Sequence, residues 1–234
     1  MVTLKTLPPP DQLDSKVGNE NVLLLSCVGD DTSYKLFKKL QIMGWNPVVV
    51  IHPADEGTIN EIWSEDNKQI LRLESGDDKA IEALLTKISN EYGSIGAFIH
   101  LHPDCRKSNR EILFDPGSQE VIKTVFLMAK HLKKILGNVK DTSRAIFMTV
   151  ARLDGQFGMK AGSEFDPLGG GLSGLVKTLN QEWQGVFCRS LDISPSINSD
   201  EAAQLIVAEM MDPNRLITEA GYGDLGRVTL VVEG

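Results

Sequence analysis

Short apolar runs alternate with helix-forming segments along most of this chain, and the alternation limits the folds that it can adopt. The runs are NVLLLSCV (21–28), NPVVVIHP (46–53), GAFIHLHP (96–103), RAIFMTVA (144–151) and VFCRSLDI (186–193). Continuous apolar runs of this length are typical of strands buried on both faces. Because strands that alternate with helices form parallel β-α-β units, the sequence predicts an α/β fold with a doubly wound, mainly parallel sheet.

The segments between and after these runs complete a Rossmann-like pattern. A first helix is expected from Asp31 or Thr32 to Gly44, and others over 57–64, 77–92, 120–136, 170–184 and 201–211, the last capped by Ser199 or Asp200. The tail RLITEAGYGDLGRVTLVVE predicts a C-terminal hairpin around a glycine-rich turn. We expect one degenerate, truncated Rossmann-like domain over 21–234, preceded by a linker over 1–20 that contains three consecutive prolines.

The composition excludes several functional classes. The 234 residues carry a net charge of −8, which argues against nucleic acid or an anionic membrane as a partner. No run of about 18 apolar residues is present, and the first residues do not resemble a signal peptide. We expect a cytoplasmic protein whose cysteines, Cys27 and Cys188 above all, are buried thiols.

The turn after the first predicted strand is where a doubly wound fold normally receives a phosphate group. Here the turn, CVGDDTSYK, contains a single glycine, Gly29, followed by Asp30 and Asp31. A pyrophosphate needs glycines for close backbone approach and an uncontested positive helix terminus. Since two carboxylates at that terminus would repel it, we predict no cofactor site at this turn.

A second candidate phosphate site is the run DPLGGGLSG, which holds Gly169, Gly171 and Gly174 in the G-x-G-x-x-G pattern. Asp192 follows about twenty residues later, where a ribose-binding carboxylate would stand. The pattern requires a strand directly before the glycines, but about eighteen residues separate them from Ala151. We therefore interpret the glycines as small residues for close helix packing, and cofactor binding by these four residues remains the alternative.

Two further motifs have simpler interpretations. Tyr34 and Lys38 match Y-x-x-x-K, in which a lysine lowers the pKa of a tyrosine one helical turn away. The pair lies on the first predicted helix, so we interpret it as a solvated helix face. His100 and His102 share one side of a strand, but no third ligand follows at a common metal-site spacing. We predict neither a metal site nor catalytic residues.

Beyond single motifs, the order of the segments resembles the ketoreductase region of polyketide synthases and polyunsaturated fatty acid synthases. The family is matched, in order, by FIHLHP, a long helix, AIFMTVARLDGQFG, DPLGGGLSGLVKTLNQEWQGVFCRSLDIS and EAAQLIVAEMMDPNRLITEAGYGDLGRVTLV. The most specific run matches at Gly174, Leu175, Lys177, Thr178, Leu179, Glu182, Trp183, Cys188, Arg189 and Asp192. The resemblance covers about residues 20–232.

In that family the ketoreductase contains two folds similar to short-chain reductases. The first braces the second and binds no cofactor, whereas the second binds NADPH and carries the active site. This chain is similar to the first, because Asp166 to Leu168 and Thr149 to Ala151 stand where the reductase tyrosine and serine would be. The resemblance thus implies a non-catalytic structural subdomain, with NADPH held only in the parent ketoreductase.

The resemblance also implies partners. They are the catalytic subdomain in the same chain, an acyl carrier protein and neighbouring synthase domains, with helices 120–136 and 170–184 as the pairing surface. Two alternatives remain open: an active NADPH-dependent short-chain reductase with an atypical site, and an acidic protein-interaction module. A subdomain that lacks its partner is expected to expose an apolar patch of at least several hundred Å².

Overall fold

The computed structural model describes residues 1–13, 21–52, 63, 68–103, 116–139, 144–160 and 167–232. Its strands are β1 Val2–Thr6, β2 Val22–Cys27, β3 Asn46–Ile51, β4 Ile70–Arg72, β5 Ile95–Leu101, β6 Ile146–Ala151, β7 Phe187–Ile193, β8 Glu219–Gly223 and β9 Gly226–Val232. Its helices are α1 Asp31–Ile42, α2 Asp78–Glu91, α3 Pro116–Gly137, α4 Leu168–Glu182 and α5 Ser199–Met211. Among these helices, none combines the length and apolarity needed to cross a membrane.

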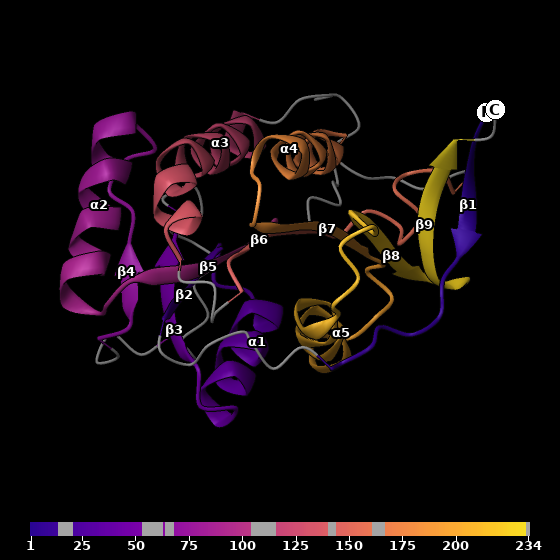
Figure 1. Ribbon diagram of the computed structural model, residues 1–234, viewed down its shortest axis with the longest axis horizontal. Helices are drawn as coiled ribbons and strands as arrows, with labels where there is room; N and C mark the ends of the chain where they lie inside the picture. Colours follow the sequence, from indigo (N-terminus) through magenta and orange to yellow (C-terminus); the bar gives the residue numbers. More distant parts are fainter. Residues whose placement is uncertain are drawn as a thin grey trace.

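The strands form one sheet in the order β1-β9-β8-β7-β6-β5-β2-β3-β4. The pairs from β4 to β8 are parallel, whereas β9 runs antiparallel to both β8 and β1. Figure 1 shows α2, α3 and α4 on one face of the sheet and α1 and α5 on the other. The predicted doubly wound α/β fold with a C-terminal hairpin is therefore confirmed.

The core is divided by the sheet into two apolar layers, because successive side chains of a strand point to opposite faces. In β2, Leu23 and Leu25 belong to the layer under α1 and α5, while Val22 and Leu24 belong to the layer under α2, α3 and α4. Burial on both faces explains why the strands are continuous apolar runs in the sequence.

Residues 2–6, which the sequence analysis placed in a linker, instead form β1. All five pair with β9, from Val2 opposite Val232 to Thr6 opposite Val228. The segment VTLKT alternates apolar and polar residues of good strand propensity, and Pro8 to Pro10 prevent the strand from continuing. So short a run is recognisable as a strand only when its distant partner is known.

Two helix caps also differ from the prediction. The Asp30 carboxylate, rather than Asp31 or Thr32, caps α1, and Asn198 caps α5 in place of Ser199 or Asp200. In both cases the helix begins one or two residues earlier than expected, a common uncertainty at helix ends. The helix expected over 57–64 lies outside the described residues, apart from Trp63.

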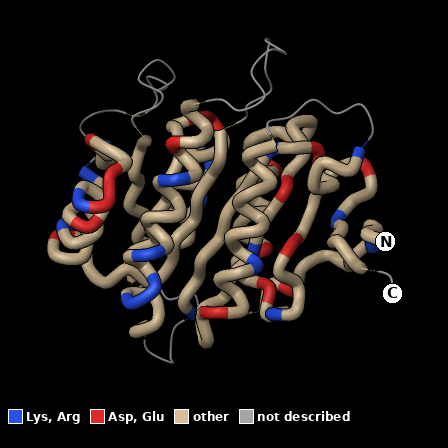
Figure 2. Tube along the Cα trace, turned by 90° about the horizontal axis from the view of Figure 1, so that it is seen from above, with Lys and Arg blue, Asp and Glu red and all other residues tan. Residues whose placement is uncertain are grey.

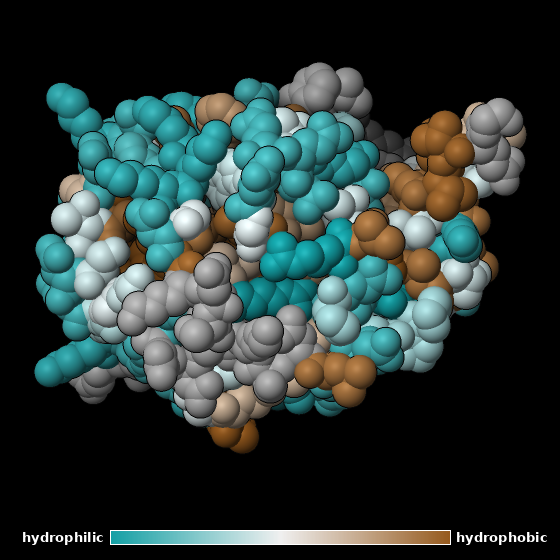
Figure 3. All heavy atoms as spheres, viewed as in Figure 1, coloured by the Kyte–Doolittle hydropathy of each residue, from teal (hydrophilic) through white to brown (hydrophobic). Residues whose placement is uncertain are grey.

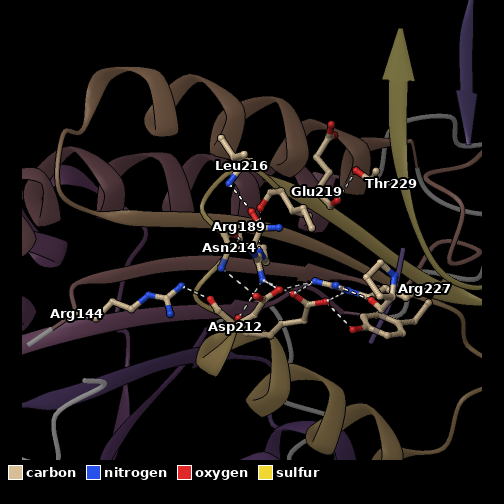
Figure 4. Close-up of polar contacts among 12 residues, drawn as sticks. Arg144, Arg189, Asp212, Asn214, Leu216, Glu219, Arg227 and Thr229 are labelled. Atoms are coloured by element: carbon tan, nitrogen blue, oxygen red, sulfur yellow. Dashed lines mark hydrogen bonds and ion pairs between the residues drawn. The ribbon is translucent and has the colours of Figure 1, made fainter. Parts of the chain in front are cut away.

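A buried network of arginines and carboxylates fastens α5 and the hairpin to the sheet. Its members are Arg189 of β7, Glu209 of α5, Asp212, and Tyr222 and Arg227 of the hairpin. Figure 4 shows Arg189 and Arg227 converging on Asp212 from two strands. Each charge has an opposite charge beside it, which makes burial tolerable.

The outer surface carries charges of both signs. Figure 2, viewed from the side of α2, α3 and α4, shows Lys and Arg interspersed with Asp and Glu along the helices. Several form exposed ion pairs, including Lys130 with Asp78 and Lys133 with Glu182. Such pairs contribute little to stability, but no surface of a single sign covers this helical layer.

Candidate functional site

The turn between β2 and α1 is the first place to look for a cofactor, because the strand order reverses between β2 and β5. Here the carboxylate of Asp30 accepts the backbone N–H of Ser33 at 2.8 Å. The Ser33 hydroxyl in turn donates to the Asp30 carbonyl at 2.7 Å. The end of α1 that would contact a phosphate therefore carries a carboxylate of its own.

Trp63 covers the same turn. Its indole N–H donates to the carbonyl of Gly29 at 2.8 Å, and only 5% of its surface is exposed. The ring packs edge-on against Tyr34, with centroids 5.4 Å apart, and against Phe37 at 5.6 Å. Gly29 has a φ of +86°, and a Cβ added there would lie 3.5 Å from the indole nitrogen. The space above the first turn is thus filled by a side chain of the protein.

The glycine-rich run lies inside α4 and not in a turn after a strand. Gly169 packs closely, since a Cβ there would lie 3.1 Å from Leu153 and 3.5 Å from His102. Gly171 and Gly174 are exposed and have open space around them within the described part of the chain. Close packing therefore accounts for Gly169 and not for the other two.

Asp192, the residue considered for ribose binding, serves the protein's own backbone. It is 1% exposed at the end of β7, and its two oxygens accept the N–H groups of Leu153 at 2.8 Å and Phe157 at 2.7 Å. The pKa of the carboxyl is raised to about 6, because burial and, to a smaller extent, neighbouring Asp154 outweigh the two N–H groups, which lower it. Asp192 holds the segment that follows β6.

That segment, residues 152–160, is organised by a second buried carboxylate. Asp154 accepts backbone N–H groups from Gln156 at 2.7 Å, and from Gly158 and Lys160 at 2.9 Å. Gly155 has a φ of +76°, and a Cβ there would collide with the carbonyl of Tyr222. The sequence predicted only a long loop over 152–168, but residues 152–160 are packed against β7 and β8. The rest of it, 161–166, lies outside the described residues.

The four residues of the alternative cofactor site do not converge. Gly169 and Asp192 line one cavity of about 140 Å³, whereas Gly171 and Gly174 face away from it on the outer side of α4. A pyrophosphate that contacted the exposed glycines would lie on the opposite side of the helix from Asp192. The G-x-G-x-x-G pattern and Asp192 therefore do not line one common cavity.

His52, His100 and His102 belong to a buried polar group on the α2–α3–α4 face of the sheet. Ser26 hydrogen-bonds to His52 Nε2 at 2.6 Å and to His100 Nδ1 at 3.2 Å, and His100 Nε2 lies 3.5 Å from His102 Nδ1. Burial lowers the pKa of His52 to about 4 and that of His100 well below its usual value. Within the described residues, no cluster of three or more His, Cys, Asp or Glu is arranged to hold a metal ion.

This polar group extends across the sheet in register. Ser26, His100, Thr149, Ser190 and Glu219 are successive Cα partners on β2, β5, β6, β7 and β8. Of this row, the sequence pattern singled out only His100, together with His102, which directly follows β5. The others are single polar residues within apolar runs, and their alignment depends on strand order, which local patterns do not contain.

Tyr34 and Lys38 do not form a proton-transfer pair. The Lys38 ammonium lies 5.7 Å from the centre of the Tyr34 ring, over its face. Lys38 is exposed as expected, but Tyr34 is half-buried against Trp63. The pair contributes to the packing around the first turn.

Comparison with known proteins agrees with this fold. One large component of the polyunsaturated fatty acid synthase of Thraustochytrium sp. is 27% identical to this chain over 228 residues. The match covers 92% of this chain and only 7% of that protein. No protein-family model matches the chain.

Solved structures show the same architecture. A 3-ketoacyl-(acyl-carrier-protein) reductase of Brucella melitensis, complexed with NADH, is 15% identical with a TM-score of 0.65 over 85% of this chain and 93% of that one. An enoyl-(acyl-carrier-protein) reductase (NADH) of Aquifex aeolicus is 15% identical with a TM-score of 0.64 over 89% and 94% of the two chains. The chain therefore has the Rossmann-like fold of short-chain dehydrogenases and reductases.

Proposed function

We propose that this chain is the non-catalytic structural subdomain of a ketoreductase in a multidomain polyketide or polyunsaturated fatty acid synthase. It braces a catalytic subdomain that binds NADPH and reduces β-ketoacyl intermediates on an acyl carrier protein. The observation that carries the proposal is the first turn of a reductase fold filled by Asp30 and Trp63. A first turn that carries its own carboxylate and is covered by a tryptophan is suited to a supporting role.

The similarity to a fatty acid synthase component supports this proposal. The matched segment is 7% of that protein, as expected for one domain among many. The loop 152–160 adds support, because Asp154 and Asp192 pack it onto the sheet directly after Thr149 to Ala151, the position that the resemblance assigns to the catalytic serine. A cytoplasmic location is part of the proposal, and the buried free thiols of Cys27 and Cys188 agree with it.

The proposed pairing surface is the outer side of α3 and α4. On α3, the half-buried Ile122 and the exposed Phe126 stand one turn apart; on α4, Gly171, Gly174 and the half-buried Leu175 leave room for a close partner. A large exposed aromatic beside small residues is suited to a protein interface.

A second apolar surface lies at the edge of the sheet. Figure 3 shows apolar side chains gathered beside the β1–β9 edge, while much of the remaining visible face is hydrophilic. Val2 and Val232, paired across these strands, are 48% and 81% exposed. Both surfaces are of the kind that a domain excised from a larger assembly would expose.

Activity measurements separate this proposal from an active reductase. The purified chain is incubated with NADPH and a β-ketoacyl thioester, and oxidation of NADPH is followed by its absorbance. We expect no rate above the enzyme-free control. Turnover that disappears in Asp192→Asn would instead favour the atypical reductase.

Self-association tests the pairing surface. We expect the isolated chain to associate weakly at high concentration, and Phe126→Glu to abolish this in sedimentation experiments. Ala83→Glu, on the exposed face of α2, adds the same charge elsewhere and serves as the matched control. If the parent chain stays monomeric at all concentrations, so that Phe126→Glu changes nothing, the interaction-module alternative is favoured.

A further inference from the structure

The cavity between α4 and strands β7 and β8 has no role in the proposed function. Its volume of about 140 Å³ is close to that of a protein cavity known to admit benzene, so about six non-hydrogen atoms fit. Figure 4 shows the Glu219 side chain pointing from β8 toward α4, on the other side of the sheet from Asp212 and Arg227. Exposed Gly170 and half-exposed Lys177 are part of the wall, so the cavity opens to solvent beside α4.

The protein itself compensates the charges on the cavity wall. Glu219 pairs with the Lys177 ammonium at 3.1 Å. Asp192 is 1% exposed, both of its oxygens accept backbone N–H groups, and it is hydrogen-bonded to Asp154. Because a charged ligand would meet no free opposite charge here, the cavity is suited to a neutral molecule.

Two polar side chains of the wall keep hydrogen-bonding capacity. Glu219 receives both of its side-chain contacts on Oε1, from the Ser173 hydroxyl at 2.6 Å and from Lys177, so Oε2 has no hydrogen-bond partner among the described residues. The Ser190 hydroxyl accepts from Thr149 at 3.3 Å, and its own proton makes no hydrogen bond within the described part of the chain. One side chain can therefore accept a further hydrogen bond and the other can donate one.

The acceptor and the donor come from neighbouring strands. Ser190 and Glu219 are Cα partners on β7 and β8, strands of one sheet lie about 5 Å apart, and both residues line the cavity. A carboxamide matches such a pair, because its carbonyl accepts a hydrogen bond and its N–H donates one from the adjacent atom. The rest of the wall includes the apolar side chains of Leu153, Phe157 and Leu230, which suit a short hydrocarbon chain.

We infer that this cavity binds a neutral primary carboxamide of about four carbons. The amide N–H donates to Glu219 Oε2, and the amide carbonyl accepts the Ser190 O–H. The hydrocarbon chain contacts Leu153, Phe157 and Leu230. A ketone or a carboxylate of the same shape has no N–H to donate, and either would leave Glu219 Oε2 without a partner, so the amide group selects the ligand.

Titration with butyramide tests the inference, because two molecules of the same shape serve as matched probes. In 2-pentanone a methyl group replaces the amide nitrogen, and in butyrate an oxygen replaces it and adds a negative charge. Amide NMR shifts are followed in the whole chain. We expect saturable shifts with butyramide for residues near 173–177, 190–193 and 219, with a dissociation constant of about millimolar order. Binding of 2-pentanone or butyrate should be at least about tenfold weaker. Equal binding of the three probes, or no saturable binding of butyramide, would overturn the inference.

Two variants locate the site. Ser190→Ala removes the donor and leaves the carboxylates in place, and we expect about a fivefold loss of butyramide affinity. Ser196→Ala makes the same change on the exposed turn after β7 and should bind as the parent does. Unchanged affinity in Ser190→Ala would contradict the contact with the amide carbonyl.

The second variant, Leu230→Trp, fills the cavity and should abolish the shifts. Leu225→Trp introduces the same side chain on the exposed hairpin turn and serves as its control. Butyramide that binds Leu230→Trp as tightly as the parent would contradict binding in this cavity.

Discussion

The two faces of the sheet bury polar groups in opposite ways. On the α2–α3–α4 face, Ser26, His52 and His100 are buried and form neutral hydrogen bonds. On the α1–α5 face, Arg189 and Glu209 are fully buried and charged, with Asp212 and Arg227 completing the network. Both groups lie in regions of low dielectric, where an unpaired charge is unstable.

The difference shows that the partners, and not burial alone, decide the protonation state. Burial alone would raise the pKa of Asp212, but the Asn214 N–H and the two arginines lower it. Burial is the main cause that lowers the pKa of His52 to about 4, and the charge of His102 acts in the same direction. We therefore expect the loss of a single charge on the α1–α5 face to lower the free energy of unfolding. On the α2–α3–α4 face, we expect acid to lower it.

The largest expected effect is the loss of one charge from the arginine network. Arg189→Met leaves two buried carboxylates, Glu209 and Asp212, to share Arg227, so one negative charge loses its compensation. This loss should reduce the free energy of unfolding by about 3–5 kcal/mol. Chemical denaturation measures the change, with Arg72→Met on the exposed edge strand β4 as a control that should lose no more than about 0.5 kcal/mol. Similar losses in the two variants would remove the distinction between the faces.

Acid should lower the free energy of unfolding through the buried histidines of the α2–α3–α4 face. The pKa of His52 is about 4 in the folded chain and 6.5 in the unfolded chain, so the unfolded state takes up a proton first as the pH falls. The free energy of unfolding should therefore be highest above pH 6.5 and fall between pH 6.5 and 4, by about 3 kcal/mol from this residue. Asp192 acts in the opposite direction between pH 3.8 and about 6, because burial raises its pKa.

The contribution of His52 is separated by a variant. His52→Gln retains a hydrogen-bonding group for Ser26 but does not titrate. Denaturation of parent and variant at intervals from pH 4 to 7.5 should show a steeper loss in the parent. Parallel curves would mean that His52 is not neutral and buried as described.

A smaller effect is expected from the hydroxyl that joins the hairpin to the network. The Tyr222 hydroxyl donates to the Glu209 carboxylate at 2.5 Å. The pKa of the phenol is raised, mainly by burial and also by the Glu209 charge. Tyr222→Phe should cost about 2 kcal/mol, since a buried hydrogen bond to a charged group is lost. Tyr92→Phe, which loses an exposed bond to the Lys68 carbonyl, is the matched control and should cost less than half as much.

The smallest effect is expected from the hydrogen bond between Thr149 and Ser190, which joins two neutral side chains. The Thr149 hydroxyl donates to Ser190 at a long 3.3 Å, and Thr149→Val keeps the shape of the side chain. We expect a loss of about 1 kcal/mol or less in thermal or chemical denaturation, with no change in pH dependence between pH 4 and 7. A loss as large as that of Arg189→Met would show that the row acts as a tightly coupled network.

The sequence predicted the elements whose signals are local. Apolar runs and helical periodicity located the parallel strands and most helices, and the carboxylates after Gly29 predicted a first turn unsuited to phosphate. Trp63 could not be assigned to that turn, because it is a single apolar residue in a polar stretch, and only the fold brings it to Gly29.

The partners that the sequence did not reveal are joined across long separations. Arg227 contacts the carbonyl of Pro8, 219 residues away, and β1 pairs with β9 at the other end of the chain. Asp192 had the right spacing for a ribose ligand, but the structure directs its oxygens to the backbone of residues 153 and 157. Spacing predicts which residue types are available, whereas the fold decides what they contact.

The most direct test of the central claim, that the first turn is closed to a cofactor, is a titration with NADPH. Thermal unfolding of the chain is followed with increasing NADPH, beside an active short-chain reductase as a positive control. We expect the melting temperature of this chain to stay unchanged while that of the control rises. A saturable stabilisation, which reaches about 2.7 kcal/mol at 100 times the dissociation constant, would contradict the account.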